Sequence, residues 1–109
     1  MRLEQFTIKA QESVLAAQRE AEVRHHQQVE PEHLLWVLIS QADGLVPPLL
    51  QRLEVDLERL KRRLDAELKK IPEIGGPAAA NVYVSFILKR AFDQARLEAE
   101  KLKDEFIST

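Results

Sequence analysis

Along this chain, apolar residues recur at intervals of three and four positions, the period of an amphipathic helix, rather than at the interval of two that marks a strand. The first run predicts a helix from about Leu3 to Arg24. Its apolar stripe consists of Leu3, Phe6, Ala10, Val14, Ala17 and Ala21. The small alanines of this stripe allow another helix to approach closely. No segment alternates as a strand does, so we expect an all-α fold without strands.

The second predicted helix is the most apolar segment of the chain. A polar connector at residues 25–28 leads to Pro31, and a proline is tolerated in the first turn of a helix. The helix is expected to run from Pro31 to about Ser40, and residues 34–39 within it are apolar on every side. A helix without a polar face is typical of a position enclosed by other helices. We therefore expect this segment to form the centre of the core.

Prolines, glycines and capping residues set the bounds of the next two predicted helices. A turn at residues 43–44 precedes Pro47 and Pro48, which fit in the first turn of a short helix that ends near Leu53. Asp56 is expected to cap a fourth helix. The apolar face of that helix consists of Leu57, Leu60, Leu64 and Leu68.

The clearest linker lies at residues 71–81, where two prolines and two adjacent glycines occur. A fifth helix is expected after it, from about Val82 to Glu105. Its stripe consists of Val84, Leu88, Ala91, Ala95, Ala99 and Leu102. Residues 106–107 resemble a buried strap that leads into a further helix.

The fifth helix repeats the first at a fixed offset. Ala95 and Ala99 stand 78 residues after Ala17 and Ala21, and the connector and strap align at the same offset without a gap. The expected fold is therefore a compact bundle of about five helices with a pseudo-twofold repeat whose second copy is truncated. The single domain, residues 1–109, divides into repeat one at about 3–70, the linker at about 71–81 and a partial repeat two at about 82–109.

A truncated second repeat leaves apolar surface without its covering helix. The helix at residues 31–40 has no counterpart in the second copy. Exposed apolar area favours any packing that hides it. We therefore expect self-association through the fifth helix, or its exchange between two copies.

Composition indicates one domain that folds in water. The 109 residues suit a single core, and 45% hydrophobic with 31% charged residues exclude a disordered tail and a membrane protein. The sequence carries neither a secretory signal nor a cysteine, which is compatible with the cytoplasm. A net charge of −2 does not match nucleic acid. We expect a cytoplasmic protein whose partners are neither nucleic acid nor membrane.

No catalytic motif is recognisable. The phosphate-binding pattern G-x-x-x-x-G-K-[ST] does not occur, so the chain has no ATPase motif. His25, His26 and His33 lack the H-E-x-x-H spacing of a zinc site, and a capping or core role suits His33 better. Glu30 and Glu32, at the start of a helix, complement the helix dipole. We therefore expect no catalysis, no metal and no cofactor.

The densest basic residues, at positions 61–63 and 69–70, are interspersed with acidic residues. Aromatic residues make up only 6% of the chain, so few rings are present on which bases could stack. The pattern favours a solvated helix face with ion pairs four residues apart over a nucleic-acid site.

Four short segments together carry a resemblance to a known family. They are Phe6-Thr7 before the alanine stripe, the helix start Glu30-Pro31-Glu32-His33-Leu34-Leu35, the turn from Gly44 to Leu50 with Pro48-Leu49-Leu50, and Ile71-Pro72-Glu73-Ile74. They resemble the N-terminal double-repeat domain of the Clp chaperones, which are AAA+ disaggregases and unfoldases. Met1-Arg2-Leu3 and the last segment are most similar to the ClpB-type disaggregases. Glu54 departs from the pattern, because the family commonly has a glycine there.

The resemblance implies a protein-binding module without activity of its own. Such a module sits at the mouth of a hexameric ATPase ring, collects unfolded or aggregated polypeptide and passes it to the pore. Thr7 and Asp104 match positions that the family associates with substrate handling. We expect Ser13, Val14 and Phe92 to line a groove that offers apolar surface to extended segments.

Two other functions stay open. The domain could dock a folded adaptor protein for a protease-linked Clp unfoldase, and a variant of this function reads phosphoarginine through Glu32. A structural helical oligomer would instead form a stoichiometric self-complex without affinity for unfolded chains.

Overall fold

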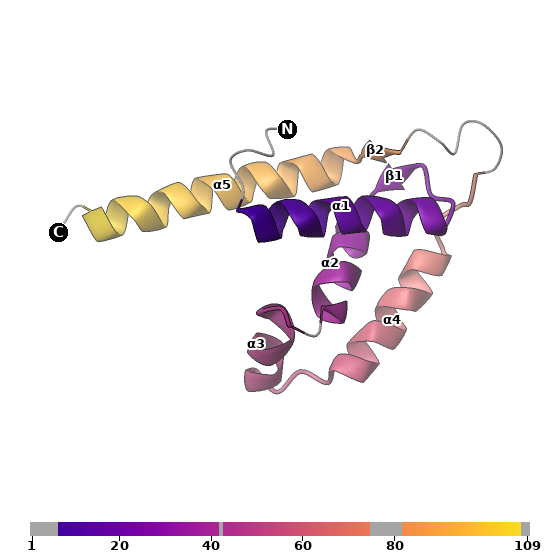
Figure 1. Ribbon diagram of the computed structural model, residues 1–109, viewed down its shortest axis with the longest axis horizontal. Helices are drawn as coiled ribbons and strands as arrows, with labels where there is room; N and C mark the ends of the chain where they lie inside the picture. The colour runs from indigo at the N-terminus through magenta and orange to yellow at the C-terminus, as the bar shows by residue number, and fades with distance from the viewer. Residues whose placement is uncertain (1–6, 42, 75–81, 108–109) are drawn as a thin grey trace.

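The computed structural model describes residues 7–41, 43–74 and 82–107, with side chains described up to residue 102. Within this part the chain forms five helices and one two-stranded sheet. The predicted all-α bundle of about five helices is therefore confirmed, except for two short strands. Figure 1 shows α2 leading away from α1 toward α3, and α4 running back toward the C-terminal end of α1.

Helix α1 spans Ile8–Val23 and begins later than predicted. Thr7 is extended, with φ −63° and ψ 162°, and its Oγ1 accepts a hydrogen bond from the N–H of Ala10 at 3.1 Å. A hydroxyl in this position satisfies one of the free N–H groups of a helix N-terminus, so α1 starts after Thr7. Leu3 and Phe6, which were predicted to belong to the same helix, lie outside the described residues.

The next three helices lie where the sequence predicts them. Their bounds are Pro31–Ser40 for α2, Val46–Arg52 for α3 and Leu57–Lys69 for α4. Pro31 and Pro47 lie in first turns, where a missing N–H removes no helical hydrogen bond. Asp56 caps α4, accepting a hydrogen bond from the N–H of Arg59 at 3.2 Å.

The turn between α3 and α4 shows which backbone conformation is required at Glu54. This residue has a φ of 63°, in the left-handed region. Glycine adopts that conformation without steric cost, whereas a side chain is disfavoured there by roughly 1–2 kcal/mol. The backbone thus has the shape that a glycine at this position would suit.

Two short strands join the segment before α2 to the segment before α5. β1, Gln28–Val29, pairs in parallel with β2, Tyr83–Val84. The N–H of Tyr83 donates to the carbonyl of Gln27, and the N–H of Ser85 donates to the carbonyl of Val29, each at 3.0 Å. The expectation of a fold without strands was wrong here, because two residues are too few for an alternating pattern to show.

Helix α5, Phe86–Ile107, begins later than the predicted Val82 because β2 occupies the expected first turn. The Oγ of Ser85 accepts a hydrogen bond from the N–H of Leu88 at 3.1 Å. Thr7 forms the same cap with the residue three positions on, 78 residues earlier in the chain. At its other end α5 continues through Ile107, so the strap expected at residues 106–107 is helical.

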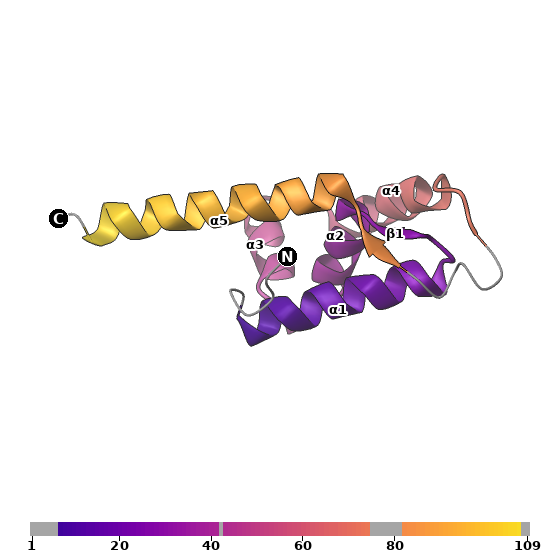
Figure 2. The ribbon, with the colours of Figure 1, turned by 90° about the horizontal axis from the view of Figure 1, so that it is seen from above.

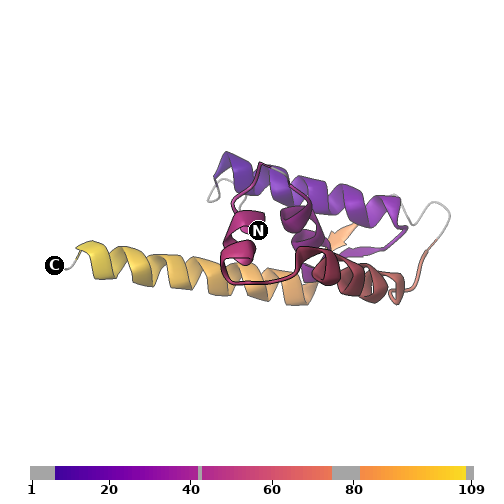
Figure 3. The ribbon, with the colours of Figure 1, turned by 90° about the horizontal axis from the view of Figure 1, so that it is seen from below.

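Helix α2 is the central element of the fold and packs against α1, α3, α4 and α5. Seen from above, α1 and α5 run antiparallel on either side of α2 (Figure 2). Seen from below, α3 and α4 lie in front of the other elements (Figure 3). The second half of α5 extends past the first turn of α1 (Figure 1).

The core consists of two apolar clusters that meet at α2. The first joins α1, β1, α2 and α5 and consists of Ala17, Ala21, Val29, Val37 and Leu88. The second joins α2 and α4 and consists of Ile39, Leu64 and Leu68. Ala17 and Ala21 are 1% and 0% exposed, so the alanine stripe predicted to allow close approach lies in the core.

Helix α2 is not enclosed on every side, contrary to the prediction. Leu35 is 36% exposed and Trp36 is only half-buried. The guanidinium carbon of Arg24 lies 5.1 Å from the centre of the Trp36 ring and shields one face of the indole. The neighbours of α2 cover its Val37 and Ile39 sides and leave the side of Leu35 open to solvent.

Most of α5 lies outside both clusters. Leu88 is buried and Phe92 is half-buried against the first cluster. The remaining helical members of its predicted stripe are exposed, namely Ala91, Ala95, Ala99 and Leu102. The helix is therefore attached to the rest of the molecule through β2 and its first two turns.

Replacing Leu68 with alanine should lower the free energy of unfolding by about 2–5 kcal/mol, because Leu68 is fully buried and its loss leaves a cavity. The matched control is Leu53→Ala. Leu53 is 67% exposed, so its truncation should change stability by less than about 0.5 kcal/mol. Urea unfolding followed by far-UV circular dichroism measures both. Equal losses in the two variants would contradict the position assigned to the core.

Candidate functional site

An apolar cavity of about 140 Å³ opens between α1, α2 and α5. Each helix contributes side chains from its inner face. The lining residues are Ala10, Ser13 and Val14 of α1, Leu34 and Leu38 of α2, and Phe92 of α5. Small residues on α1 keep the cavity open, and the ring of Phe92 forms its α5 wall.

A second hollow of about 400 Å³ adjoins the first, because Ala10, Ser13 and Leu38 line both. It continues along α1 to the turn before α3, where Leu45 is 88% exposed. We call the two hollows together the α1 groove. At its rim, Lys9 Nζ lies 3.9 Å from Asp43 Oδ2, and both side chains are largely exposed.

Ser13 holds the floor of the groove in place. Its Oγ donates to the carbonyl of Lys9 at 3.0 Å and accepts from Nε2 of Gln41 at 3.0 Å. The second bond joins α1 to the end of α2. Since the hydroxyl is engaged on both sides, Ser13 contributes shape to the groove rather than a free polar group.

The structure brings three of the predicted site residues together. Ser13, Val14 and Phe92 line one cavity, although they come from helices far apart in the sequence. Thr7 lies at the N-terminus of α1 and is engaged as its cap. Asp104 belongs to the last turns of α5, and its side chain lies outside the described residues. Glu32 is half-buried in the first turn of α2 and does not line the groove.

The sequence pattern did not reveal the α2 side of the groove. Leu34 and Leu38 were assigned to the core because their helix is apolar on every side. Their spacing of four residues places them on one face. Whether that face is covered or open depends on how far α5 lies from α1, which the periodicity of either helix does not determine.

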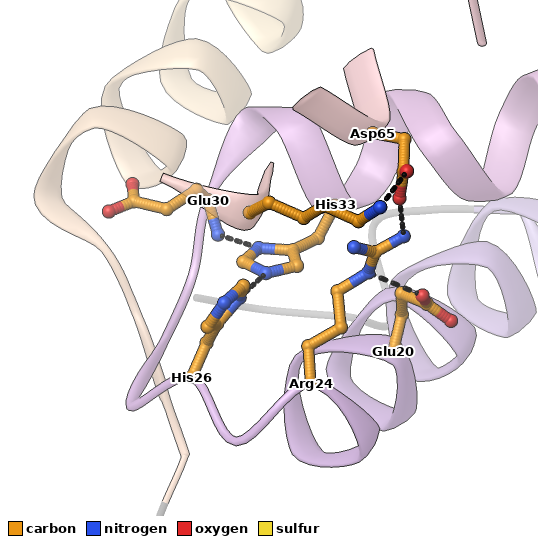
Figure 4. A network of polar contacts seen from close by, with 7 residues as sticks. Glu20, Arg24, His26, Glu30, His33 and Asp65 are labelled. Carbon is orange, nitrogen blue, oxygen red and sulfur yellow. Dashed lines mark hydrogen bonds and ion pairs between the residues drawn. The ribbon is translucent and has the colours of Figure 1, made fainter. Parts of the chain in front are cut away.

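A buried pair of histidines joins the connector after α1 to the first turn of α2 (Figure 4). Nδ1 of His33 accepts a hydrogen bond from the backbone N–H of Glu30 at 2.8 Å. Nε2 of His33 lies 2.8 Å from Nδ1 of His26. The two side chains are 0% and 3% exposed. The role predicted for His33, in capping or in the core, is confirmed, whereas His26 was assigned to a polar connector and is buried instead.

The partners of the pair fix its tautomers. Because Nδ1 of His33 accepts from a backbone N–H, its proton must be on Nε2, which then donates to Nδ1 of His26. Burial lowers the pKa of His33 to about 4, and the neighbouring His26 adds to this effect. Burial likewise lowers the pKa of His26, with a further contribution from Arg24.

Arg24 connects this region to α4 (Figure 4). Its Nε donates to Glu20 at 2.8 Å and its Nη2 to Asp65 at 2.9 Å. Hydrogen bonds from Lys69 and Arg24 lower the pKa of Asp65. The guanidinium therefore ties the end of α1 to α4 while it covers the Trp36 ring.

In the part of the chain that the structure describes, no three histidine or carboxylate side chains gather as metal ligands. The described helices also include none that is long and apolar enough to cross a bilayer.

Comparison with known proteins identifies similar chains. Residues 5–109 match the family model of the Clp repeat (R) N-terminal domain. Proteins named Chaperone protein ClpB from Bacillus cereus, Rhodopirellula baltica and Vibrio cholerae are 40%, 37% and 36% identical to this chain. The alignments cover 99% or more of this chain, but 13%, 12% and 13% of the three relatives. The chain thus spans about one eighth of the length of these curated relatives.

Replacing Ser13 with alanine should lower the free energy of unfolding by about 1–3 kcal/mol, because the amide of Gln41 loses its partner at a part-buried position. The control is Ser40→Ala, which truncates an exposed serine at the end of α2 and should leave stability within about 0.5 kcal/mol. Thermal unfolding measures both. A Ser13→Ala variant as stable as the control would show that this bond does not hold the floor of the groove.

Proposed function

The chain belongs to the Clp N-terminal repeat domain family, and from this we propose that it is a non-catalytic module that binds unfolded or aggregated polypeptide clients. In this proposal the module serves the AAA+ ring of a ClpB-type disaggregase and delivers clients to its pore. The relatives that support the proposal are named as ClpB chaperones. This chain aligns with only a small part of each relative, so its link to an ATPase ring is part of the proposal.

The observation that carries the proposal is the α1 groove. Its inner cavity is lined almost entirely by apolar atoms and is open to solvent. Unfolded proteins differ from folded ones in exposing apolar side chains, and a preformed apolar groove binds such side chains without first having to fold. The smaller cavity suits one aliphatic or aromatic side chain of the client. The second, larger hollow leaves room for the neighbouring residues of the client.

The groove also supports weak and degenerate binding. The polar groups at its rim are few, and Gln41 is already engaged with Ser13. Specificity for one client sequence requires several fixed polar partners, whereas an apolar surface binds many different sequences. A module that hands clients on to a ring benefits from this, because tight binding would retain them.

Binding of a fluorescently labelled, reduced and alkylated model protein tests the proposal. Phe92→Asp should weaken binding at least tenfold, because a carboxylate would have to be desolvated in the apolar cavity. Leu97→Asp is the matched control, since it places the same charge on an exposed position of α5 that does not line the groove. Fluorescence anisotropy measures both affinities, and far-UV circular dichroism verifies that both variants keep their helices.

Equal affinities for the two variants would contradict the groove as the client site. Thr7→Ala is less informative, because loss of the α1 cap by itself costs about 1 kcal/mol of stability. Binding of a folded adaptor or of an arginine-phosphorylated peptide that is lost in Glu32→Gln but kept in Phe92→Asp would instead favour the adaptor-docking or phosphoarginine function, since Glu32 does not line the groove.

A further inference from the structure

The histidine pair lies where the attachment of α5 begins. Glu30, whose N–H is bound by His33, directly follows β1. The carbonyls of Gln27 and Val29 accept hydrogen bonds from the N–H groups of Tyr83 and Ser85, so β1 pairs with β2, and β2 leads into α5. The α5 wall of the groove, at Phe92, is therefore connected to His33 through a short sequence of backbone contacts.

The hydrogen bonds of the pair leave no place for an additional proton. Nδ1 of His33 faces the N–H of Glu30, and Nδ1 of His26 faces the N–H on Nε2 of His33. A proton added to either Nδ1 would set two donors against each other. Protonation thus requires at least one of these bonds to open.

We propose that His26, His33 and the N–H of Glu30 form an acid-sensitive latch that holds β1 in position to bind β2, and that protonation of the pair releases α5 from α1 and α2. We refer to these three groups as the histidine latch. The role of the latch in client handling rests on the function proposed above, because its opening would remove the Phe92 wall from the groove.

The direction of the pH effect follows from the difference in the pKa of His33 between the open and the closed latch. A freed His33 has the ordinary histidine pKa of about 6.5, whereas burial in the closed latch lowers the pKa to about 4. At pH 7.5 the ring is largely neutral in both states. Between pH 6.5 and pH 4 the open state binds a proton that the closed state does not, so acid favours opening. At pH 5 this shifts the equilibrium toward the open state by roughly 30-fold.

Charged groups on several neighbouring segments act on the latch. Cationic Arg24 and the neighbouring His25 oppose protonation, whereas carboxylates at three positions favour it. These carboxylates are Glu20 on α1, Glu30 before α2 and Glu73 after α4. Asp65 on α4 acts indirectly, by pairing with Arg24. Charges of both signs thus surround the pair, and burial is the largest cause of its resistance to protonation.

Two spin labels measure whether α5 leaves the bundle. The chain has no cysteine, so Glu12→Cys on α1 and Asp93→Cys on α5 provide two exposed attachment sites. The distance distribution between the labels should be narrow at pH 7.5. At pH 5 it should broaden toward longer distances while the far-UV helical signal remains.

His33→Asn is the informative variant. The amide oxygen of asparagine can accept the hydrogen bond from Glu30, but the side chain does not titrate. This variant should keep the narrow distribution at pH 5. The matched control, His25→Asn, removes an exposed histidine of the same connector and should broaden as the parent does. If His33→Asn does not fold, nuclear magnetic resonance of the unmodified protein provides the test, because the ring protons of His33 and the Ser85 amide should change together with pH.

An unchanged distance distribution at pH 5 would overturn the latch, as would loss of all helical signal together with the distance change. It would also be overturned if the resonances of the His33 ring and the Ser85 amide changed with different pH midpoints. The spin-label experiment contains no client. Failure of the groove to bind unfolded protein at pH 7.5 would therefore refute the proposed function alone, and failure of the distance change would refute the latch alone.

Discussion

The backbone N–H of Glu30 needs a hydrogen-bond acceptor at the start of α2, and His33 supplies it from inside the protein. This bond determines which nitrogen of His33 carries the proton and therefore which nitrogen of His26 must accept it. His26 has to turn inward after α1, and the chain then passes through β1 directly into α2. The relative positions of α1, β1 and α2 thus depend on a buried polar contact, and leaving either of its partners unsatisfied would be costly.

The small residues of α1 determine how closely the neighbouring helices pack along its length. Ala17 and Ala21 let α1 lie close to the central helix near the histidines. Toward the other end of α1, Ala10 and Ser13 leave the space between the helices unfilled, and α5 contributes only Phe92 to it. The same helix is therefore closely packed at one end and borders an apolar groove at the other. Because α5 is attached through β2 and its first two turns, the groove is the part of the molecule whose shape depends most on that attachment.

Local signals predicted much of this fold. The three-and-four spacing of apolar residues, Pro31 at the start of α2 and Asp56 before α4 determine structure within a few residues, so the sequence alone places these helices. The small size of Ala17 and Ala21 also predicted close packing, because an alanine on a helix is buried only where another element lies close to that helix. Ser13, Val14 and Phe92 were also expected to meet, and they share one cavity.

What the sequence did not reveal depends on contacts between distant segments. β1 and β2 are two residues each, and they exist because Val29 and Ser85 meet across more than 50 positions of the chain. His26 reads as part of a polar connector until its partner on α2 is known. The exposure of Leu35 likewise depends on where the neighbouring helices end rather than on the pattern of α2 itself.

Hydrogen exchange at single amides is the most direct test of the claim that α5 is attached through β2 and the histidine region. At pH 7 the amides of Tyr83, Ser85 and Leu88 should exchange as slowly as that of Glu30, because all four open only when this attachment opens. The amides at residues 97–102 should exchange much faster, since that part of α5 packs against neither cluster. Uniform protection along α5, or exchange at Tyr83 and Ser85 as fast as in an unfolded chain, would contradict the account.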